Sequence, residues 1–384
     1  MEIKMRLTNI VLVMLFFPIL LFAADKPALV IEGKKLDFPE YENYIRNERP
    51  GYEPEYKIHF SSKDEIMLSF FKRTKQPVLT LKDNPETAGL SFNVLFFSKE
   101  DGKLINKAEW PAVGELDWIE RLQYGSRIYP LPDNGYVGVF NKHLQILDSS
   151  LNVVHDRVLE RLQEQKYVYG IQAPSHGSFF SLWKTDKRYS GEKEIIDSNT
   201  FKTIGRISEG IVDIWGDKML LVGFSGNDIN YVYEKRIGST SDGFNIKIDY
   251  YTDAKYVHNG TAIVLGYRGN ILPPHAKHYW FTIENGKAGN PVFVGKGFAT
   301  YLVTARKAPV VAIIIAKLRS FDRGAARCIN VYNTNTQQML LQTKTYNEEF
   351  DYVLSADGKS LAVFFKTQKR IELYKIPEPG SKKK

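Results

Sequence analysis

The sequence predicts an all-β fold, and two observations support that prediction. Of the 384 residues 13% are aromatic, with 22 Tyr and 23 Phe against 6 Met, as in cores built from many short strands. Short apolar or alternating runs are separated by Gly, Asn, Asp and Pro, which is typical of successive strands and hairpins. At most one short helix is expected, over residues 151–165. With 43% hydrophobic and 25% charged residues, the composition excludes disordered, collagen-like and coiled-coil chains.

The N-terminus predicts export. Lys4 and Arg6 precede an uninterrupted apolar run over residues 10–24, which has the length of a signal-peptide core and is short for a membrane span. The two Ala residues that end the run suit cleavage, but the Leu and Phe before them are larger than a cleavage site prefers. We therefore expect a periplasmic or extracellular protein, with tethering by an uncleaved segment as the alternative.

A strand, a tight polar turn and a strongly apolar strand recur along the chain. Two near copies have turns at residues 131–135 and 354–358, before the apolar runs 136–140 and 361–365. Five looser copies have turns at 63–64, 176–177, 216–217, 259–260 and 308–309. From residue 135, the steps to 177, 217, 260, 309 and 358 are 42, 40, 43, 49 and 49 residues. This spacing matches the roughly 40 to 50 residues of a four-stranded propeller blade.

A second repeated unit, a hairpin, follows each turn unit and supplies the third and fourth strands. Its six complete copies cover residues 92–110, 144–154, 194–207, 229–250, 279–294 and 329–343. The seventh has only one strand, at 371–375, so it lacks an outer strand, and the isolated apolar segment 28–36 is available to supply it. The sequence therefore predicts a seven-bladed β-propeller closed by an N-terminal strand, which leaves no open sheet edge between blades.

Four segments follow from this organisation. We expect a signal peptide over 1–24, the closing strand and a connector over 25–54, the propeller over 55–376 and a disordered basic tail over 377–384. The tail contains two Pro, a Gly and three terminal Lys.

The second and last units resemble a known family. Asp357, Gly358 and Lys359, followed by the apolar run 361–363 and by the segment 371–374 (Ile, Glu, Leu, Tyr), are similar to bacterial exported WD-repeat or YVTN-type β-propellers. The resemblance extends over about residues 55–376, although the Trp-Asp and Gly-His pairs of true WD repeats are absent from their usual places. It implies a propeller fold and ligand binding on one face, with no reaction attached.

Candidate metal sites are weak. His275 and His278 are three residues apart, but Pro273 and Pro274 favour a loop and no further ligands adjoin. The segment 225–230 offers oxygen ligands without the later acidic residue of a calcium loop, so it is better interpreted as a solvated turn. Cys328, the only cysteine, excludes an intramolecular disulfide and is expected to be a buried, inert thiol. We expect no metal and no cofactor.

Carboxylates and tryptophans gather in one connector. Glu115, Asp117 and Glu120, with Trp110 and Trp118, fit a carbohydrate site with paired acids, which would make the protein a propeller-type hydrolase or lyase. Acids that alternate with Leu and Trp also fit an exposed connector with one buried side, and this interpretation needs no special geometry. No phosphate-binding loop, nucleophile elbow or Cys-His pair is found.

Positive charge concentrates in the loops between second and third strands. These loops contain 18 Lys and Arg against 6 Asp and Glu, while the rest of the chain after residue 24 carries a net charge of −5. Solvated surface lysines are the alternative explanation. The candidate binding residues are Lys72, Arg73, Lys184, Arg188, Arg268, Arg319, Arg323, Lys369 and Arg370.

Two classes of function follow. The favoured one is a non-catalytic binding or scaffold propeller, a monomer whose basic loops hold an acidic polysaccharide, anionic lipid headgroups or an acidic protein surface. The alternative is the carbohydrate-active hydrolase or lyase. Positive charges recur in several loops whereas the carboxylates occupy one connector, which favours binding. No specific nucleic-acid binding is expected.

Overall fold

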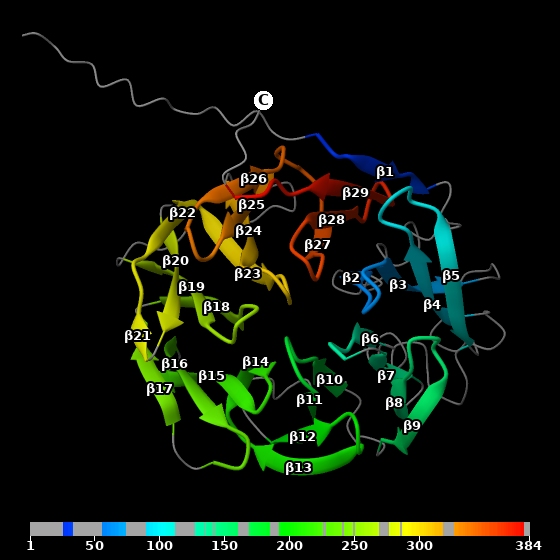
Figure 1. The fold of residues 1–384 in the computed structure, drawn as a ribbon, viewed down its shortest axis with the longest axis horizontal. Coiled ribbons are helices and arrows are strands. Elements are labelled where there is room, and N and C mark those ends of the chain that lie inside the picture. Colours follow the sequence, from blue (N-terminus) through cyan, green and yellow to red (C-terminus); the bar gives the residue numbers. More distant parts are fainter. Residues whose placement is uncertain are drawn as a thin grey trace, which may run out of the picture.

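Seven antiparallel sheets are arranged in a ring (Figure 1). The computed structural model describes residues 26–33, 56–73, 90–111, 127–133, 135–140, 143–159, 169–184, 192–225, 228–239, 242–248, 250–268, 276–284, 286–317 and 326–379. These ranges contain no helix, and so none that could cross a membrane. The predicted all-β, seven-bladed propeller is confirmed.

The first four blades follow one another along the chain. Blade 1 contains β2 (Lys57–Phe60), β3 (Ile66–Arg73), β4 (Leu90–Phe97) and β5 (Leu104–Pro111). Blade 2 contains β6 (Arg127–Pro130), β7 (Tyr136–Phe140), β8 (His143–Leu147) and β9 (Val153–Val158). Blade 3 contains β10 (Tyr169–Gln172), β11 (Phe179–Lys184), β12 (Lys193–Asp197) and β13 (Lys202–Ile207). Blade 4 contains β14 (Gly210–Trp215), β15 (Lys218–Ser225), β16 (Asp228–Arg236) and β17 (Asp242–Lys247).

The last three blades complete the ring. Blade 5 contains β18 (Tyr250–Tyr256), β19 (Ala262–Arg268) and β20 (Lys277–Glu284), with β21 (Lys287–Ala288) and β22 (Val292–Lys296) both paired to β20. Blade 6 contains β23 (Phe298–Thr304), β24 (Val310–Lys317), β25 (Ala326–Asn333) and β26 (Met339–Gln342). Blade 7 contains β27 (Phe350–Leu354), β28 (Ser360–Phe365), β29 (Arg370–Lys375) and the N-terminal β1 (Leu29–Ile31).

The N-terminal strand closes the ring as predicted. β1 pairs with β29, with Leu29 opposite Leu373 and Ile31 opposite Ile371, and Figure 1 shows it along the outside of blade 7. Ile31 is 3% exposed and packs with the core between blades 7 and 1. Two ends of the chain are therefore held in one sheet.

The short helix expected at residues 151–165 is wrong where the structure describes that range. Residues 153–158 form β9, the outer strand of blade 2, and residues 160–168 lie outside the described ranges. An outer strand contacts the blade on one side only, so Val153, Val154 and Val158 are more than half exposed in the same strand as a His, an Asp and an Arg. Over the longer segment 151–165, this mixture of apolar and charged residues is also typical of a short helix.

The two near-copy turns need glycine for the same reason. Gly135 (φ +94°) and Gly358 (φ +69°) have left-handed backbones that favour glycine. A Cβ atom on Gly135 would lie 2.3 Å from the carbonyl oxygen of Leu147, and one on Gly358 would lie 2.8 Å from the Cβ atom of Ala308. These turns let the backbone approach its neighbours closely.

The hydrophobic core consists of seven clusters, each of which joins two neighbouring blades. The cluster between blades 7 and 1, for example, contains Phe364 of β28 and Phe70 of β3. A blade buries its apolar faces only against its neighbours, so the ring is the unit that folds.

Carboxylates in three first strands add polar ties between blades. Asp213 accepts hydrogen bonds from the N–H of Ile214 (2.8 Å) and from that of Tyr256 in the next blade (2.7 Å). Asp253 accepts from Ala254 (2.9 Å) and from Leu302 in the next blade (2.8 Å). Asp351 accepts from Tyr352 (3.0 Å) and from Ile58 in blade 1 (3.2 Å). The same pair of hydrogen bonds therefore occurs at blades 4, 5 and 7.

The strand order defines two faces of the ring. One, the turn face, has the connections from first to second and from third to fourth strands. The other, the loop face, has the connections from second to third strands and the links between blades. Strands alternate in direction, so consecutive connections fall on opposite faces.

Candidate functional site

The predicted basic residues map to the loop face as far as the structure describes them. Lys72, Arg73, Lys184 and Arg268 occupy the last positions of β3, β11 and β19. Lys369 and Arg370 lie where β29 begins. Arg188, Arg319 and Arg323 lie outside the described ranges.

Two cations counted in these loops are part of the blades. Lys193 is 1% exposed in β12, and burial lowers the pKa of its ammonium to about 8. Arg370 lies 3.0 Å from the carboxylate of Glu372 and 4.8 Å from the ring centroid of Phe365. Glu372 is itself 2% exposed and also binds Lys344 at 3.0 Å. Arg370 thus stabilises blade 7 and is a poor choice for a test of surface charge.

The links between blades share the loop face, and they change the charge distribution. Counted together with the strand ends that border them, the loops and links within blades 5 to 7 (residues 268–278, 317–327, 343–349 and 366–370) contain 10 Lys and Arg against 3 Asp and Glu. Counted in the same way, the remaining loops and links after β1 (residues 32–56, 72–89, 112–126, 141–143, 159–168, 184–193, 208–209, 225–228 and 248–249) contain 16 Lys and Arg against 19 Asp and Glu. Positive charge therefore belongs to the half of the loop face over blades 5 to 7, which we call the basic sector.

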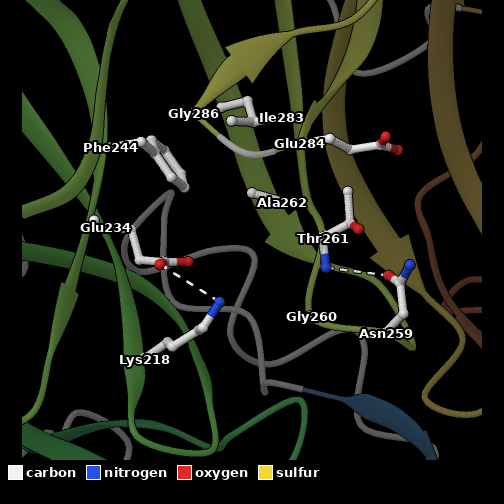
Figure 2. A pocket seen from close by; sticks show the side chains of 11 residues that line it. Lys218, Glu234, Phe244, Asn259, Gly260, Thr261, Ala262, Ile283, Glu284 and Gly286 are labelled. Carbon is white, nitrogen blue, oxygen red and sulfur yellow. Dashed lines mark hydrogen bonds and ion pairs between the residues drawn. The ribbon is translucent and has the colours of Figure 1, made fainter.

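A pocket of about 480 Å³ opens on the turn face between blades 4 and 5 (Figure 2). Its floor contains a buried carboxylate, Glu234 of β16, which is 8% exposed. Lys218 of β15 places its ammonium 3.5 Å from one oxygen of this carboxylate, and the hydroxyl of Tyr256 donates to the other oxygen at 3.1 Å. Burial and the Glu234 charge raise the pKa of Tyr256, so the phenol keeps its proton and remains a donor.

The walls of the pocket leave room beside this carboxylate. A Cβ atom on Gly243 would lie 2.6 Å from Glu234 Oε1, so only glycine leaves the carboxylate in place. Figure 2 shows Phe244 on one side of the pocket and Thr261 and Asn259 on the other. The Thr261 N–H donates to Asn259 Oδ1 at 3.1 Å, and the exposed Glu284 completes the lining.

A second polar group joins blades that are not neighbours in the ring. The guanidinium of Arg306, which follows β23 in blade 6, donates to the carbonyl oxygen of Pro130 in blade 2 at 2.9 Å. Burial lowers the Arg306 pKa to about 10, and Asp213 opposes this shift. Burial, followed by the charges of Lys57 and Arg306, lowers the pKa of His59 to about 3. Arg306 therefore ties opposite sides of the ring.

The candidate acids, tryptophan, histidine and cysteine from the sequence do not form one site in the described residues. Residues 115–120 lie outside the described ranges, whereas Trp110 stacks on Phe140 at 4.6 Å between blades 1 and 2. His278 is buried, and its Nε2 lies 2.7 Å from the carbonyl oxygen of Gly297. Within the described ranges, no three His, Cys, Asp or Glu side chains form a group that would hold a metal ion. Cys328 is buried, as expected.

Sequence reasoning missed the pocket because its residues come from two blades. One signal was present: alternation in β16 places Glu234 on the same side of the strand as Val232, which is fully buried. A carboxylate at an inward position needs a partner, but the partner lies in other strands.

Comparison with known proteins supports the fold alone. No family model matches the chain, and no curated protein matches it. A chain in a solved structure described as "Crystal Structure of Mitotic Checkpoint Complex" is similar, with a TM-score of 0.54 and 12% sequence identity. The match covers 92% of this chain and 93% of that one. The seven-bladed, WD40-like propeller fold is therefore shown by both topology and likeness.

Proposed function

We propose that this protein is an exported, non-catalytic binding propeller whose basic sector holds an anionic partner. The observation that carries the proposal is the excess of 10 Lys and Arg over 3 Asp and Glu in the loops and links of blades 5 to 7, counted with the strand ends that border them. Two of these cations, Lys344 and Arg370, pair with Glu372. Charge of one sign on one face attracts an oppositely charged surface over about a Debye length, roughly 8 Å at physiological salt. The closed ring provides a rigid support for such a surface.

The partner is an acidic polysaccharide, anionic lipid headgroups or an acidic protein surface. The similar chain in the mitotic checkpoint complex belongs to a protein assembly, which supports testing an acidic protein surface first. Binding through surface charge needs no catalytic group, so this function rests on the site and not on the fold.

A charge-reversal experiment tests the proposal. The triple variant Arg268→Glu, Arg319→Glu and Arg323→Glu is compared with a control of equal charge change, Lys72→Glu, Arg73→Glu and Arg188→Glu, which lies over blades 1 to 3. Glycan, lipid and acidic-protein arrays are probed at about 50 mM and about 500 mM salt. We expect binding that weakens with salt, is lost in the first variant and persists in the control.

Two results would contradict this proposal. Binding that ignores both salt and the Arg268, Arg319 and Arg323 substitutions would exclude an electrostatic partner. Turnover of a polysaccharide that is abolished by Glu115→Gln or Asp117→Asn would favour the hydrolase or lyase instead.

Export is part of the same proposal and has its own test. The apolar run over residues 10–24 supports a signal peptide, so mature protein from the cell envelope or the medium should begin near Asp25. Recovery of the intact N-terminus from the cytoplasm would contradict export.

A further inference from the structure

We propose that the pocket between blades 4 and 5 binds a neutral saccharide. The pocket lies on the turn face, opposite the basic sector, so this site is distinct from the one proposed above. Its volume of about 480 Å³ falls within the range of small-ligand sites, roughly 300 to 1,000 Å³.

The floor of the pocket mixes fixed acceptors and donors. Glu234 uses one lone pair for the hydroxyl of Tyr256 and attracts the ammonium of Lys218, yet a carboxylate accepts about four hydrogen bonds. Lys218 brings three N–H donors to the same floor, with its ammonium 3.5 Å from Glu234. A ligand hydroxyl both donates and accepts, so vicinal hydroxyls match a neighbouring carboxylate and ammonium.

The charge of the pocket selects against ionic ligands. Lys218 balances Glu234 in the floor, and Glu284 adds a negative charge at the exposed lip. An anion would face both carboxylates, and a cation in the floor would compete with Lys218 for Glu234. A neutral polar ligand leaves the ion pair intact, because it needs no counter-charge.

The walls supply the remaining features of a sugar site. The half-buried ring of Phe244 offers an apolar surface on one side, which suits the C–H face of a pyranose. Thr261 and Asn259 face it with a hydroxyl and an amide, both able to contact ring hydroxyls. Gly243 and Gly286 keep the pocket open between these groups.

The site is tested with a pair of matched glycine variants. Gly243→Ala pushes its Cβ against the Glu234 carboxylate, whereas Gly205→Ala, also in the outer strand of a blade, has no neighbour within 4 Å. Thr261→Val is a second pocket variant that removes a hydroxyl at nearly constant volume. Melting temperatures are measured for all three to confirm folding.

Binding is measured by calorimetry and saturation-transfer NMR. The probes are glucose, galactose, mannose, N-acetylglucosamine, maltose and cellobiose, with glucuronate and glucosamine as charged counterparts. We expect at least one neutral sugar to bind, with affinity that persists at high salt. Loss of one hydrogen bond to a charged group should weaken that affinity on the order of tenfold in Gly243→Ala, several-fold in Thr261→Val and little in Gly205→Ala.

Three outcomes would overturn the proposal. The first is that none of the neutral sugars binds at tens of millimolar. The second is binding that is unchanged in both folded pocket variants, which would place the sugar elsewhere. The third is stronger binding of glucosamine or glucuronate than of every neutral sugar, which would make this an ionic site. None of these results depends on the basic sector, because its residues are unchanged in every variant.

Discussion

His59 is a half-buried base whose protonation opposes folding. Its imidazole remains neutral in the folded protein down to about pH 3, whereas the unfolded chain titrates at the ordinary value of 6.5. Between these two pH values the unfolded chain binds the extra proton, so the free energy of unfolding falls as pH falls. The slope for one such group is about 1.4 kcal/mol per pH unit. The raised pKa values of the buried Asp213 and the half-buried Asp351 have the opposite effect, because protonation of those groups favours the folded state.

We predict that His59→Gln is less sensitive to acid than the wild type. Its free energy of unfolding is measured by urea titrations between about pH 7.5 and 5. Below pH 6.5 the decrease per pH unit should be smaller than in the wild type by about 1.4 kcal/mol, the slope for one group. Subtraction of the two curves removes the shared contribution of the carboxylates. Parallel curves over this interval would show that His59 is protonated in the folded state.

Single residues also show what a sequence does and does not reveal. Asp213, Asp253 and Asp351 stand among apolar residues of predicted strands, which marks them as acids at semi-buried positions. Their partners are backbone N–H groups of the following blade, and register shifts next to Asp213 and Asp253 turn these carboxylates toward it. Local pattern does not encode such a partner, because it is fixed only when the ring has closed.

At the scale of elements, the closing strand has two different sides. Ile31 is 3% exposed and packs into the core between blades 7 and 1, while its neighbour Val30 is 38% exposed. Successive side chains of β1 point to opposite sides, so a substitution at Ile31 changes core packing and one at Val30 changes the exposed side. The three-residue strand has few contacts of its own, so each buried side chain counts strongly.

We predict that Ile31→Asp destabilises the ring and that Val30→Asp does not. A charge buried without a partner should cost about 3 kcal/mol or more and expose the edge of β29 to aggregation. Deletion of residues 28–36 should have the same effect. Thermal melts followed by light scattering test this, and equal melting curves for the two Asp variants would contradict closure by β1.

The second strands were the most predictable elements, since each is an apolar run that directly follows a polar turn. The expected run 136–140 coincides with β7, and the run 361–365 lies within β28, which begins one residue earlier. The fourth strand of blade 5 was harder, because it consists of two pieces, β21 and β22, that both pair with β20. Outer strands are held from one side, so their sequences are less constrained.

At the scale of the molecule, the seven core clusters each join neighbouring blades, while Arg306 joins two blades that are not neighbours. Arg306 of blade 6 reaches the carbonyl of Pro130 in blade 2 and lies close enough to His59 in blade 1 to lower its pKa. The neighbouring Lys307 has the same charge but an exposed side chain. Substituting either residue by a neutral one removes the same charge, so a comparison of the two variants isolates the effect of the Arg306–Pro130 hydrogen bond.

We predict that Arg306→Met loses about 2 kcal/mol of unfolding free energy, the usual worth of a hydrogen bond from a charged donor, while Lys307→Met loses little. Removal of the Arg306 charge should also raise the pKa of His59 above 3, because one of the cations that disfavour its protonation is gone. NMR titration of the His59 ring measures that shift separately from stability. A His59 pKa that is the same in both variants would show that the charge of Arg306 does not act on His59.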